Sequence, residues 1–350
     1  MVGFLVAGGI GDSILSLAMV GKLEDMFGEV VIVCFDRSLV PILSYRGNKV
    51  RCLHLTNMAS VSVAYDLIKD CSLAVWNRFE CDNDGLSNYF YSLDKSTASI
   101  PQTMLGIYKK NLSKELGREV KSLEEEVRNG IMTLFSSEEN YYSDWNRYGF
   151  DVSYDDVFIS VPYSVIHKNK SKSDFIGKYS IVHDSRIFSS LQNMKSWEED
   201  KWKHVVDYLK SIGHSVICFH NKGEKTIGNS FSCYDYLPED FTFFDFLYLL
   251  SRSSIYVGTD SWPAHAAIFL QGPKFILLKG AVSKRWDHFR KYSTIIRKGR
   301  CQSCEYISLE KCIWQFGRKT CMKNISSSDV ISEIDKNLNF YEGNEPFSIV

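Results

Sequence analysis

The sequence lacks any long apolar run and any dominant charge. No apolar stretch approaches the ~20 residues that a membrane-spanning helix needs. The first residues carry no basic segment and reach glycines and Asp12 too early for a secretion signal, so we expect a cytoplasmic protein. The net charge is −1 over 350 residues, which gives no overall indication of a nucleic-acid-binding protein.

The glycine-rich segment AGGIGDS, residues 7–13, lacks the features of two common phosphate-binding motifs. With Gly9 and Gly11 as the first glycines of a dinucleotide fingerprint, the third position falls on Ile14, and no Gly-Lys-Ser/Thr follows for a phosphate loop. The segment offers a tight turn and a carboxylate, Asp12, at the start of a helix-like stretch. Asp12 is therefore either a helix cap or part of the chemistry, and the segment alone leaves both open.

The sequence does contain two stretches in which strands and helices alternate, which predicts parallel sheets covered on both faces. The polar segment 167–178 separates them and reads as a linker. We predict an N-terminal domain at 1–165, a linker at 166–178, a C-terminal domain at 179–325 and a final helix and tail at 326–350. Strands are expected at 2–7, 29–35, 49–55, 73–78, 179–185, 214–220, 254–259 and 274–280. Helices are expected at 13–27, 61–71, 109–135, 198–213, 242–253, 263–272 and 326–341.

Polar motifs follow several of these strands, at the edge where parallel sheets bind ligands. Residues 183–197 surround Lys195 with hydroxyls and amides, and Glu224 follows the next strand. The most informative motif is YVGTDSWPAHAA, residues 256–267. There a buried strand ends before Pro263, a residue favoured at the first helical position, so the helix start predicts an anion site that His265 can reach. A lysine in a loop or a histidine on a helix is also common without any such role.

Three elements together resemble glycosyltransferase family 9, the ADP-heptose:lipopolysaccharide heptosyltransferases. They are Gly11-Asp12, Lys195-Ser196-Trp197 and Asp260-Ser261-Trp262-Pro263-Ala264-His265, in the family's order and at comparable separations. The resemblance is strongest over 180–325. It implies the GT-B fold, an α/β architecture of two Rossmann-like domains facing a central cleft, with the acceptor side N-terminal and the nucleotide-sugar side C-terminal.

The resemblance also implies metal-independent, inverting glycosyl transfer and gives roles to single residues. Asp12 would be the general base, Lys195 would hold the donor diphosphate and Glu224 would contact the ribose. Asp260 would bind the sugar, and the helix start from Ser261 to His265 would face the diphosphate. A metal-dependent transferase would need an Asp-x-Asp pair, and the one such triplet, residues 82–84, lies in a polar loop. The family has glycine where this chain has Trp262, which makes a smaller donor sugar or another binding pose plausible.

Ten cysteines fall into two groups. The scattered ones, of which Cys218 is one, are expected to be reduced thiols. The others follow the spacing C-x2-C-x7-C-x8-C, which suits a tetrahedral zinc or iron but is also compatible with unligated thiols or disulfides. Similar cysteine sets occur in relatives within the family, where they imply a structural metal rather than a catalytic one. The four residues are Cys301, Cys304, Cys312 and Cys321.

The sequence therefore predicts an inverting GT-B enzyme that moves a sugar, heptose by family default, from an ADP- or UDP-sugar to a hydroxyl acceptor. A glycolipid such as lipopolysaccharide core is the favoured acceptor, which would place the protein at the inner face of the membrane. One alternative is transfer of another sugar, such as a pentose, to a protein or a modified DNA base, because residues 279–300 carry eight basic residues against one acid. A second alternative is a non-catalytic GT-B binding protein.

Overall fold

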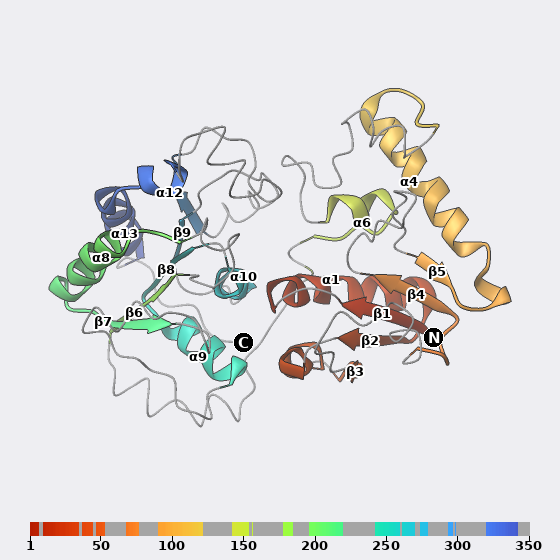
Figure 1. The fold of residues 1–350 in the computed structure, drawn as a ribbon, viewed down its shortest axis with the longest axis horizontal. Coiled ribbons are helices and arrows are strands. Elements are labelled where there is room, and N and C mark those ends of the chain that lie inside the picture. The colour runs from red at the N-terminus through yellow and green to blue at the C-terminus, as the bar shows by residue number, and fades with distance from the viewer. Residues whose placement is uncertain are drawn as a thin grey trace. The chain divides into compact units, whose positions relative to one another are not determined.

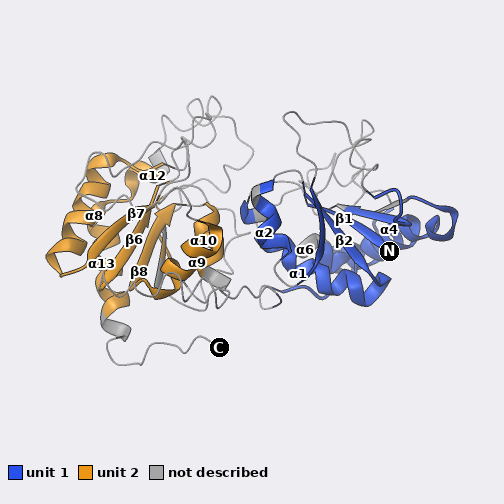
Figure 2. Cartoon of the chain, turned by 90° about the horizontal axis from the view of Figure 1, so that it is seen from below, with its two compact units in different colours: residues 1–158 blue, residues 159–350 orange. Residues whose placement is uncertain are grey.

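The computed structural model divides into two compact units, residues 1–158 and 159–350 (Figure 2). Of the predicted linker, only Lys178 falls in the part of the chain that the structure describes. The described residues are 1–6, 10–34, 37–44, 47–52, 68–76, 90–121, 142–153, 156, 178–184, 196–219, 242–259, 261–269, 274–278, 293–296, 298 and 320–341.

The sheet of the first unit has the strand order β3-β2-β1-β4-β5 among the described residues (Figure 1). All neighbours are parallel except β5, which pairs antiparallel with β4. The order reverses between β1 and β4, which is the point where open α/β sheets bind ligands. The strands are β1 (Val2–Val6), β2 (Val30–Cys34), β3 (Lys49–Cys52), β4 (Leu73–Trp76) and β5 (Phe90–Ser92).

Side chains alternate between the faces of this first sheet, and each face has its own packing partners. Phe4 of β1 meets the Trp145 ring of α6 at 6.4 Å between centroids, while its neighbour Leu5 packs with Val31 and Ile68 on the other face. Gly3 belongs to the second face, where a Cβ would lie 2.6 Å from Cγ2 of Ile68. The helices are α1 (Ile10–Phe27), α2 (Val40–Leu43), α4 (Ile100–Leu116) and α6 (Ser143–Arg147), with 3-10 turns η1 (Arg37–Leu39) and η2 (Lys95–Thr97).

The sheet of the second unit has the order β10-β9-β8-β6-β7 among the described residues, and its neighbouring strands are all parallel. Here the order reverses between β6 and β8. Helices α8 and α13 cover one face, and α9 and α10 cover the other (Figures 1 and 2). The strands are β6 (Tyr179–His183), β7 (Ser215–Phe219), β8 (Ile255–Thr259), β9 (Lys274–Leu278) and β10 (Ser293–Ile296). The helices are α8 (Glu199–Ser211), α9 (Phe243–Arg252), α10 (Trp262–Phe269), α12 (Thr320–Asn324) and α13 (Ser327–Tyr341).

The helices of the second unit begin and end where local chemistry favours it. Thr242 and Asp245 form a capping box at the start of α9. Ser326 and Asp329 form the same pair of bonds at the start of α13: the backbone N–H of each residue donates to the side chain of the other. Helix α8 ends before Gly213, whose φ of +84° is a left-handed conformation that glycine adopts without strain.

Two sequence expectations are wrong, and two strands were missed. The helix expected over 109–135 ends at Leu116, because Gly117 takes a left-handed φ of +66° and terminates it. Cys218 is disulfide-bonded rather than reduced. Strands β5 and β10 were missed because each is short and its few apolar residues stand among aromatic or basic neighbours in the sequence. The expected helix at 61–71 falls mostly outside the described residues.

Candidate functional site

In the first unit, the carboxyl end of β1 leads into the start of α1. The helix begins at Ile10, so Gly11 and Asp12 lie within its first turn. The interpretation of Asp12 as the residue capping this helix is therefore wrong, because a cap residue precedes the first helical turn. An acidic residue in the first turn is still favoured by the helix dipole. Gly9 lies outside the described residues.

The start of α1 is held firmly in the first unit. Ser13 and Ser16 are both buried, and the hydroxyl of Tyr142 donates a hydrogen bond of 2.8 Å to the carbonyl of Leu15. This tyrosine immediately precedes α6, so one buried contact fixes α1 against the aromatic packing around that helix. The backbone that carries Asp12 therefore has a defined position at the β1/β4 switch point.

In the second unit, one hydrogen bond spans the switch point between β6 and β8. The hydroxyl of Ser261 lies 3.0 Å from Nδ1 of His183, the last residue of β6, and 3.3 Å from the carbonyl of Thr259, the last residue of β8. His183 and Thr259 are fully buried. Ser261 thus joins the carboxyl ends of two strands to the residue immediately before α10.

Helix α10 directs its N-terminus to the same edge of the sheet. It starts at Trp262, followed by Pro263, and His265 lies in the first turn and is buried. The positive end of the helix dipole favours an anion here. Ser261 and His265 both lie at the start of α10, and their role at an anion stays a prediction. Asp260 lies outside the described residues.

The predicted Lys-Ser-Trp element begins outside the described residues, but its end is well anchored. Oδ1 of the buried Asp184 accepts a hydrogen bond of 3.1 Å from the backbone N–H of Trp197. The indole of Trp197 is buried in the core and donates to the carbonyl of Ile325 at 3.1 Å. Asp184 thus closes the loop between β6 and α8 across its base. Lys195 itself lies outside the described residues, so its predicted role stays a prediction.

Trp262 packs sideways into a cluster of aromatic rings. Its indole lies 4.9 Å from the ring of Phe246, 5.5 Å from Phe243 and 5.6 Å from Phe219, measured between centroids. Phe219 ends β7 and also contacts His183 at 5.5 Å. Trp262 and Phe243 remain partly exposed, whereas Phe219 and Phe246 are buried beneath them.

The predicted metal ligands are only partly within the described residues. Cys321 lies in α12, while Cys301, Cys304 and Cys312 fall outside. No three His, Cys, Asp or Glu side chains converge as a metal site would require within the part that is described. Helix α12 leads directly to Ile325, whose carbonyl also accepts from Nζ of Lys201 at 2.8 Å. The cysteine segment therefore ends against the start of α8. Glu224 is also outside the described residues.

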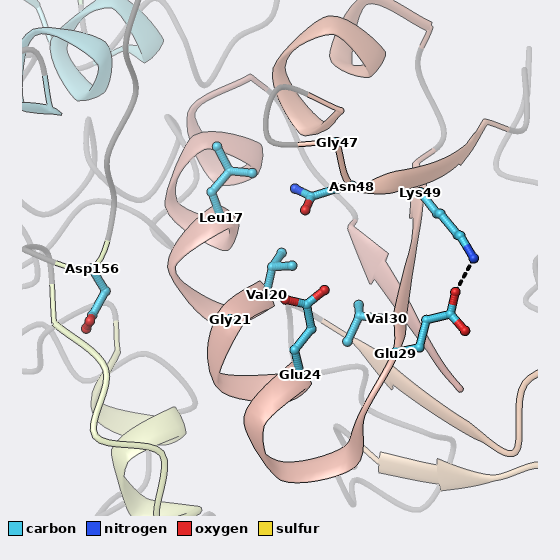
Figure 3. Close-up of a pocket in the computed structure, with 10 residues that line it drawn as sticks. All are labelled: Leu17, Val20, Gly21, Glu24, Glu29, Val30, Gly47, Asn48, Lys49 and Asp156. Carbon is cyan, nitrogen blue, oxygen red and sulfur yellow. Dashed lines mark hydrogen bonds and ion pairs between the residues drawn. The ribbon is translucent and has the colours of Figure 1, made fainter.

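A cavity of about 440 Å³ opens in the first unit, at the opposite edge of the sheet (Figure 3). It lies between α1 and the first residues of β2 and β3, and its polar lining is mainly acidic. Lys49 forms an ion pair with Glu29, and Nζ of Lys22 lies 3.4 Å from a carboxylate oxygen of Asp156. The lining residues are Leu17, Val20, Gly21, Glu24, Glu29, Val30, Gly47, Asn48, Lys49 and Asp156.

Two residues at the second switch point were not singled out from the sequence. His183 and Asp184 end the strand YSIVH and begin the loop after it, and both are buried polar residues. Their position could have indicated them, because a histidine and a carboxylate stand at the end of an apolar strand, where parallel sheets bind ligands. Of the basic segment 279–300, Lys298 is described, and its ammonium lies 3.1 Å from Asp329 of α13.

None of the described helices is both long and apolar enough to cross a bilayer. No family model matches the sequence, and no curated protein matches it. Several solved structures do share its fold over nearly the whole chain. The glycosyl transferase family 9 protein from Veillonella parvula superposes with a TM-score of 0.61 at 14% identity, covering 97% of each chain.

Two further structures extend this likeness. ADP-heptose LPS heptosyltransferase II of E. coli gives a TM-score of 0.61 at 12% identity over 98% of this chain and 99% of its own. The iron-containing dodecameric glycosyltransferase TibC of enterotoxigenic E. coli gives 0.54 at 11% identity over 97% and 76%. The predicted α/β fold of the GT-B type, and the likeness to family 9 at the level of fold, are thus confirmed.

Proposed function

We propose that the protein is an inverting glycosyltransferase that moves a sugar from a nucleoside diphosphate donor to a hydroxyl acceptor. The observation that carries the proposal is the Ser261–His183 contact across the β6/β8 switch point, beside the N-terminus of α10. This contact supports an anion site there, because helix N-termini favour anions and α/β sheets bind nucleotides at this edge. The fold shared with heptosyltransferases makes a nucleotide sugar the natural ligand.

On the donor side, positive groups would stabilise the diphosphate as it leaves. The N-terminus of α10 would contact the phosphates, and Ser261 would hold that helix start in place through its bonds to β6 and β8. We assign Lys195 to the diphosphate and His265 to the same anion. Asp260 would bind the sugar and Glu224 the ribose. Fixed dipoles and charges aimed at developing negative charge are a large part of catalysis in such reactions.

On the acceptor side, Asp12 would act as the general base, with Gly9 and Gly11 keeping the turn free of side-chain bulk. Its carboxylate takes the proton from the acceptor hydroxyl while that oxygen forms a bond to the anomeric carbon. The bond from that carbon to the diphosphate oxygen breaks, and the nucleoside diphosphate leaves with the bonding electron pair. Attack from the opposite face inverts the anomeric centre. We place no metal in this step, since lysine and helix dipole would neutralise the leaving charge.

We further propose that the four C-terminal cysteines hold a structural zinc or iron. Four thiolates suit either metal, and four protein ligands leave no open position for chemistry. Helix α12, which carries Cys321, leads into Ile325, and the carbonyl of that residue binds Trp197 and Lys201 of the second unit. A metal here would stabilise that junction. Metal analysis of the purified protein and of Cys321→Ser tests this: the variant should lose bound metal.

The favoured acceptor is a hydroxyl of a glycolipid such as lipopolysaccharide core, and the favoured sugar is heptose, carried by ADP or UDP. This follows the likeness in fold to a lipopolysaccharide heptosyltransferase. A protein acting on such an acceptor would work in the cytoplasm at the inner face of the membrane. Radiolabel transfer from ADP-heptose to lipid extracts, compared with transfer to protein and DNA, identifies the acceptor class.

The first test is a thermal-shift panel with ADP, UDP, GDP, CDP and TDP without added metal. A nucleotide at ~100 times its dissociation constant should add about 2.7 kcal/mol to the free energy of unfolding. Ser261→Ala should reduce affinity for that nucleotide about 5-fold, because it removes one hydrogen bond that holds α10. Ser251→Ala, which removes a hydroxyl bonded within α9, is the matched control. No shift with any nucleotide would overturn the enzyme proposal in favour of a non-catalytic scaffold.

A further inference from the structure

The aromatic cluster around Trp262 forms a wall at the donor edge of the second unit. Phe219 and Phe246 are buried and lie 4.1 Å apart. Trp262 lies 4.9 Å from Phe246 and 5.6 Å from Phe219, and Phe243 lies 5.5 Å from Trp262. Three phenylalanine rings around one indole leave it little freedom to rotate. The partly exposed rings are therefore a preformed surface rather than mobile side chains.

This wall directly adjoins the helix start to which we assign the phosphates. Trp262 is the first residue of α10 and follows Ser261, and Phe219 contacts His183. A group joined to a phosphate at α10 therefore comes within reach of the indole. The wall's described rings offer no hydrogen-bonding group apart from the indole N–H of Trp262.

That chemistry selects which part of a nucleotide sugar the wall suits. A sugar presents hydroxyls on most of its edges, and each needs a hydrogen-bond partner when it is buried. A nucleobase presents a flat face that stacks on aromatic rings without any such partner. A purine covers more of the wall than a pyrimidine, and so gains more from stacking.

We propose that Trp262 and Phe243 form the stacking platform for the base of the donor, and that the platform favours a purine nucleoside diphosphate. This rests on the proposed function, because it assumes phosphates at the start of α10. Trp262 is then a specificity residue for the base, while Ser261 and His265 act on the diphosphate. The sugar lies on the side of the diphosphate away from the platform.

The test is isothermal titration of ADP, UDP and inorganic pyrophosphate, without added divalent metal and at fixed salt, into the wild type and three variants. Trp262→Ala should weaken ADP by about 5- to 150-fold, the range that loss of one stacked base produces. The same variant should lose less affinity for UDP, and its affinity for pyrophosphate should stay within 2-fold of the wild type. Trp262→Phe should retain most of the ADP affinity. Tyr208→Ala, which removes another partly exposed aromatic ring, on α8, should change none of the three. Thermal unfolding of each variant confirms that it is folded.

The outcomes separate this inference from the function on which it rests. Equal loss of ADP and pyrophosphate in Trp262→Ala would mean that the wall only supports α10, and would overturn the platform. Unchanged ADP affinity in that variant would also overturn it while leaving the donor site intact. ADP-heptose titrated alongside gives a further outcome: weaker binding of ADP-heptose to Trp262→Ala, with ADP affinity unchanged, would assign the wall to the sugar instead. Failure of the wild type to bind ADP or UDP would overturn both proposals.

Discussion

The carboxyl edges of the two sheets differ in what they present to a ligand. In the first unit, the described part of this edge is the end of β1 and the first turn of α1, where Gly11 has no side chain and Ser13 is buried. In the second, the described edge contains buried polar side chains, with Ser261 bound to His183 and Asp184 bound to the backbone of Trp197. The proposed function assigns the hydroxyl acceptor to the first edge and the charged donor to the second.

The largest effect we predict tests that division. Asp12→Asn should lower turnover by about 10²–10⁴-fold, because the amide cannot take the proton from the acceptor. Affinity for the nucleoside diphosphate should stay unchanged, since that ligand is assigned to the second unit. Steady-state kinetics and titration calorimetry measure the two quantities separately. Asp25→Asn, an exposed position on the same helix, is the control. Unchanged turnover in Asp12→Asn would remove the first unit from the chemistry.

The next prediction concerns the cores beneath the two edges. Trp145 packs on Phe4 in the first unit, and Trp202 packs on Trp197 at 5.0 Å in the second, and both are fully buried. Either change to alanine should cost about 3–5 kcal/mol through lost packing and a cavity. Calorimetry with and without ADP distinguishes the two. ADP should raise the unfolding transition that Trp202→Ala lowers and leave unchanged the transition that Trp145→Ala lowers. The reverse pattern would place the donor in the first unit.

Sensitivity to acid should also separate the units. Burial, and secondarily Lys178, lowers the pKa of His214 to about 4, and its Nδ1 lies 2.6 Å from the hydroxyl of Ser180. The unfolded chain binds a proton below a pH of about 6.5, whereas the folded histidine stays neutral until pH 4. Neutral His214 therefore makes its full contribution to the free energy of unfolding above pH 6.5. As the pH falls from 6.5 to 4, the free energy of unfolding should decrease by up to about 3 kcal/mol. The ion pair between Arg51 and Asp70 in the first unit is exposed and should contribute little.

Denaturant midpoints of the wild type at pH 7, 5 and 4 measure this effect. His214→Gln, which keeps a hydrogen-bonding group but does not titrate, should flatten the dependence on pH. His204→Gln, at an exposed position on α8, should leave it unchanged. An identical pH profile in wild type and His214→Gln would show that another group controls acid sensitivity.

Much of the fold followed from the sequence because apolar strands carry a strong local signal. The strands from β1 to β4 and from β6 to β9 occur where alternation predicted them, and Gly213 ends α8 as expected. The end of α4 was missed because charged residues continue the helical spacing past Gly117, while the backbone turns left-handed there. The spacing of apolar and charged residues predicts which residues can form a helix, but it does not predict at which glycine the helix ends.

The candidate site followed only in part, for a related reason. Ser261 and His265 sit beside a strand end and a proline that can be read locally. The partner of Ser261 is His183, which lies far away in sequence, and the pairing depends on the order of β6 and β8 in the sheet. Trp262 made a smaller donor sugar or another binding pose plausible, and nothing in the sequence indicated that its ring packs on Phe243 and Phe246. Contacts between segments that are distant in sequence cannot be predicted from any one of those segments.

A smaller effect on the free energy of unfolding is expected at one glycine in each sheet, where a neighbouring side chain packs directly on the glycine. A Cβ on Gly3 would lie 2.6 Å from Ile68, and one on Gly258 would lie 2.2 Å from the hydroxyl oxygen of Tyr256. Alanine at either position should destabilise by about 1–3 kcal/mol through overpacking. The effect should be greater at Gly258, because the stiff ring of a buried tyrosine cannot move aside. Chemical denaturation measures both. Ile68→Ala and Tyr256→Leu should each rescue only the glycine variant of their own unit.

The smallest effects should have opposite signs in the two units. Gly21 and Gly106 lie inside helices α1 and α4 of the first unit, where an added Cβ would meet no atom within 4 Å. Alanine at either should therefore stabilise by about 0.5–1 kcal/mol, since it restricts the unfolded chain and has the higher helix propensity. Gly213 in the second unit also has open space, but its φ of +84° disfavours a side chain, so Gly213→Ala should destabilise by about 1 kcal/mol. Urea denaturation of the three variants measures the signs. A loss at Gly21 with a gain at Gly106 would mean that the cavity beside α1 needs the space which glycine leaves open.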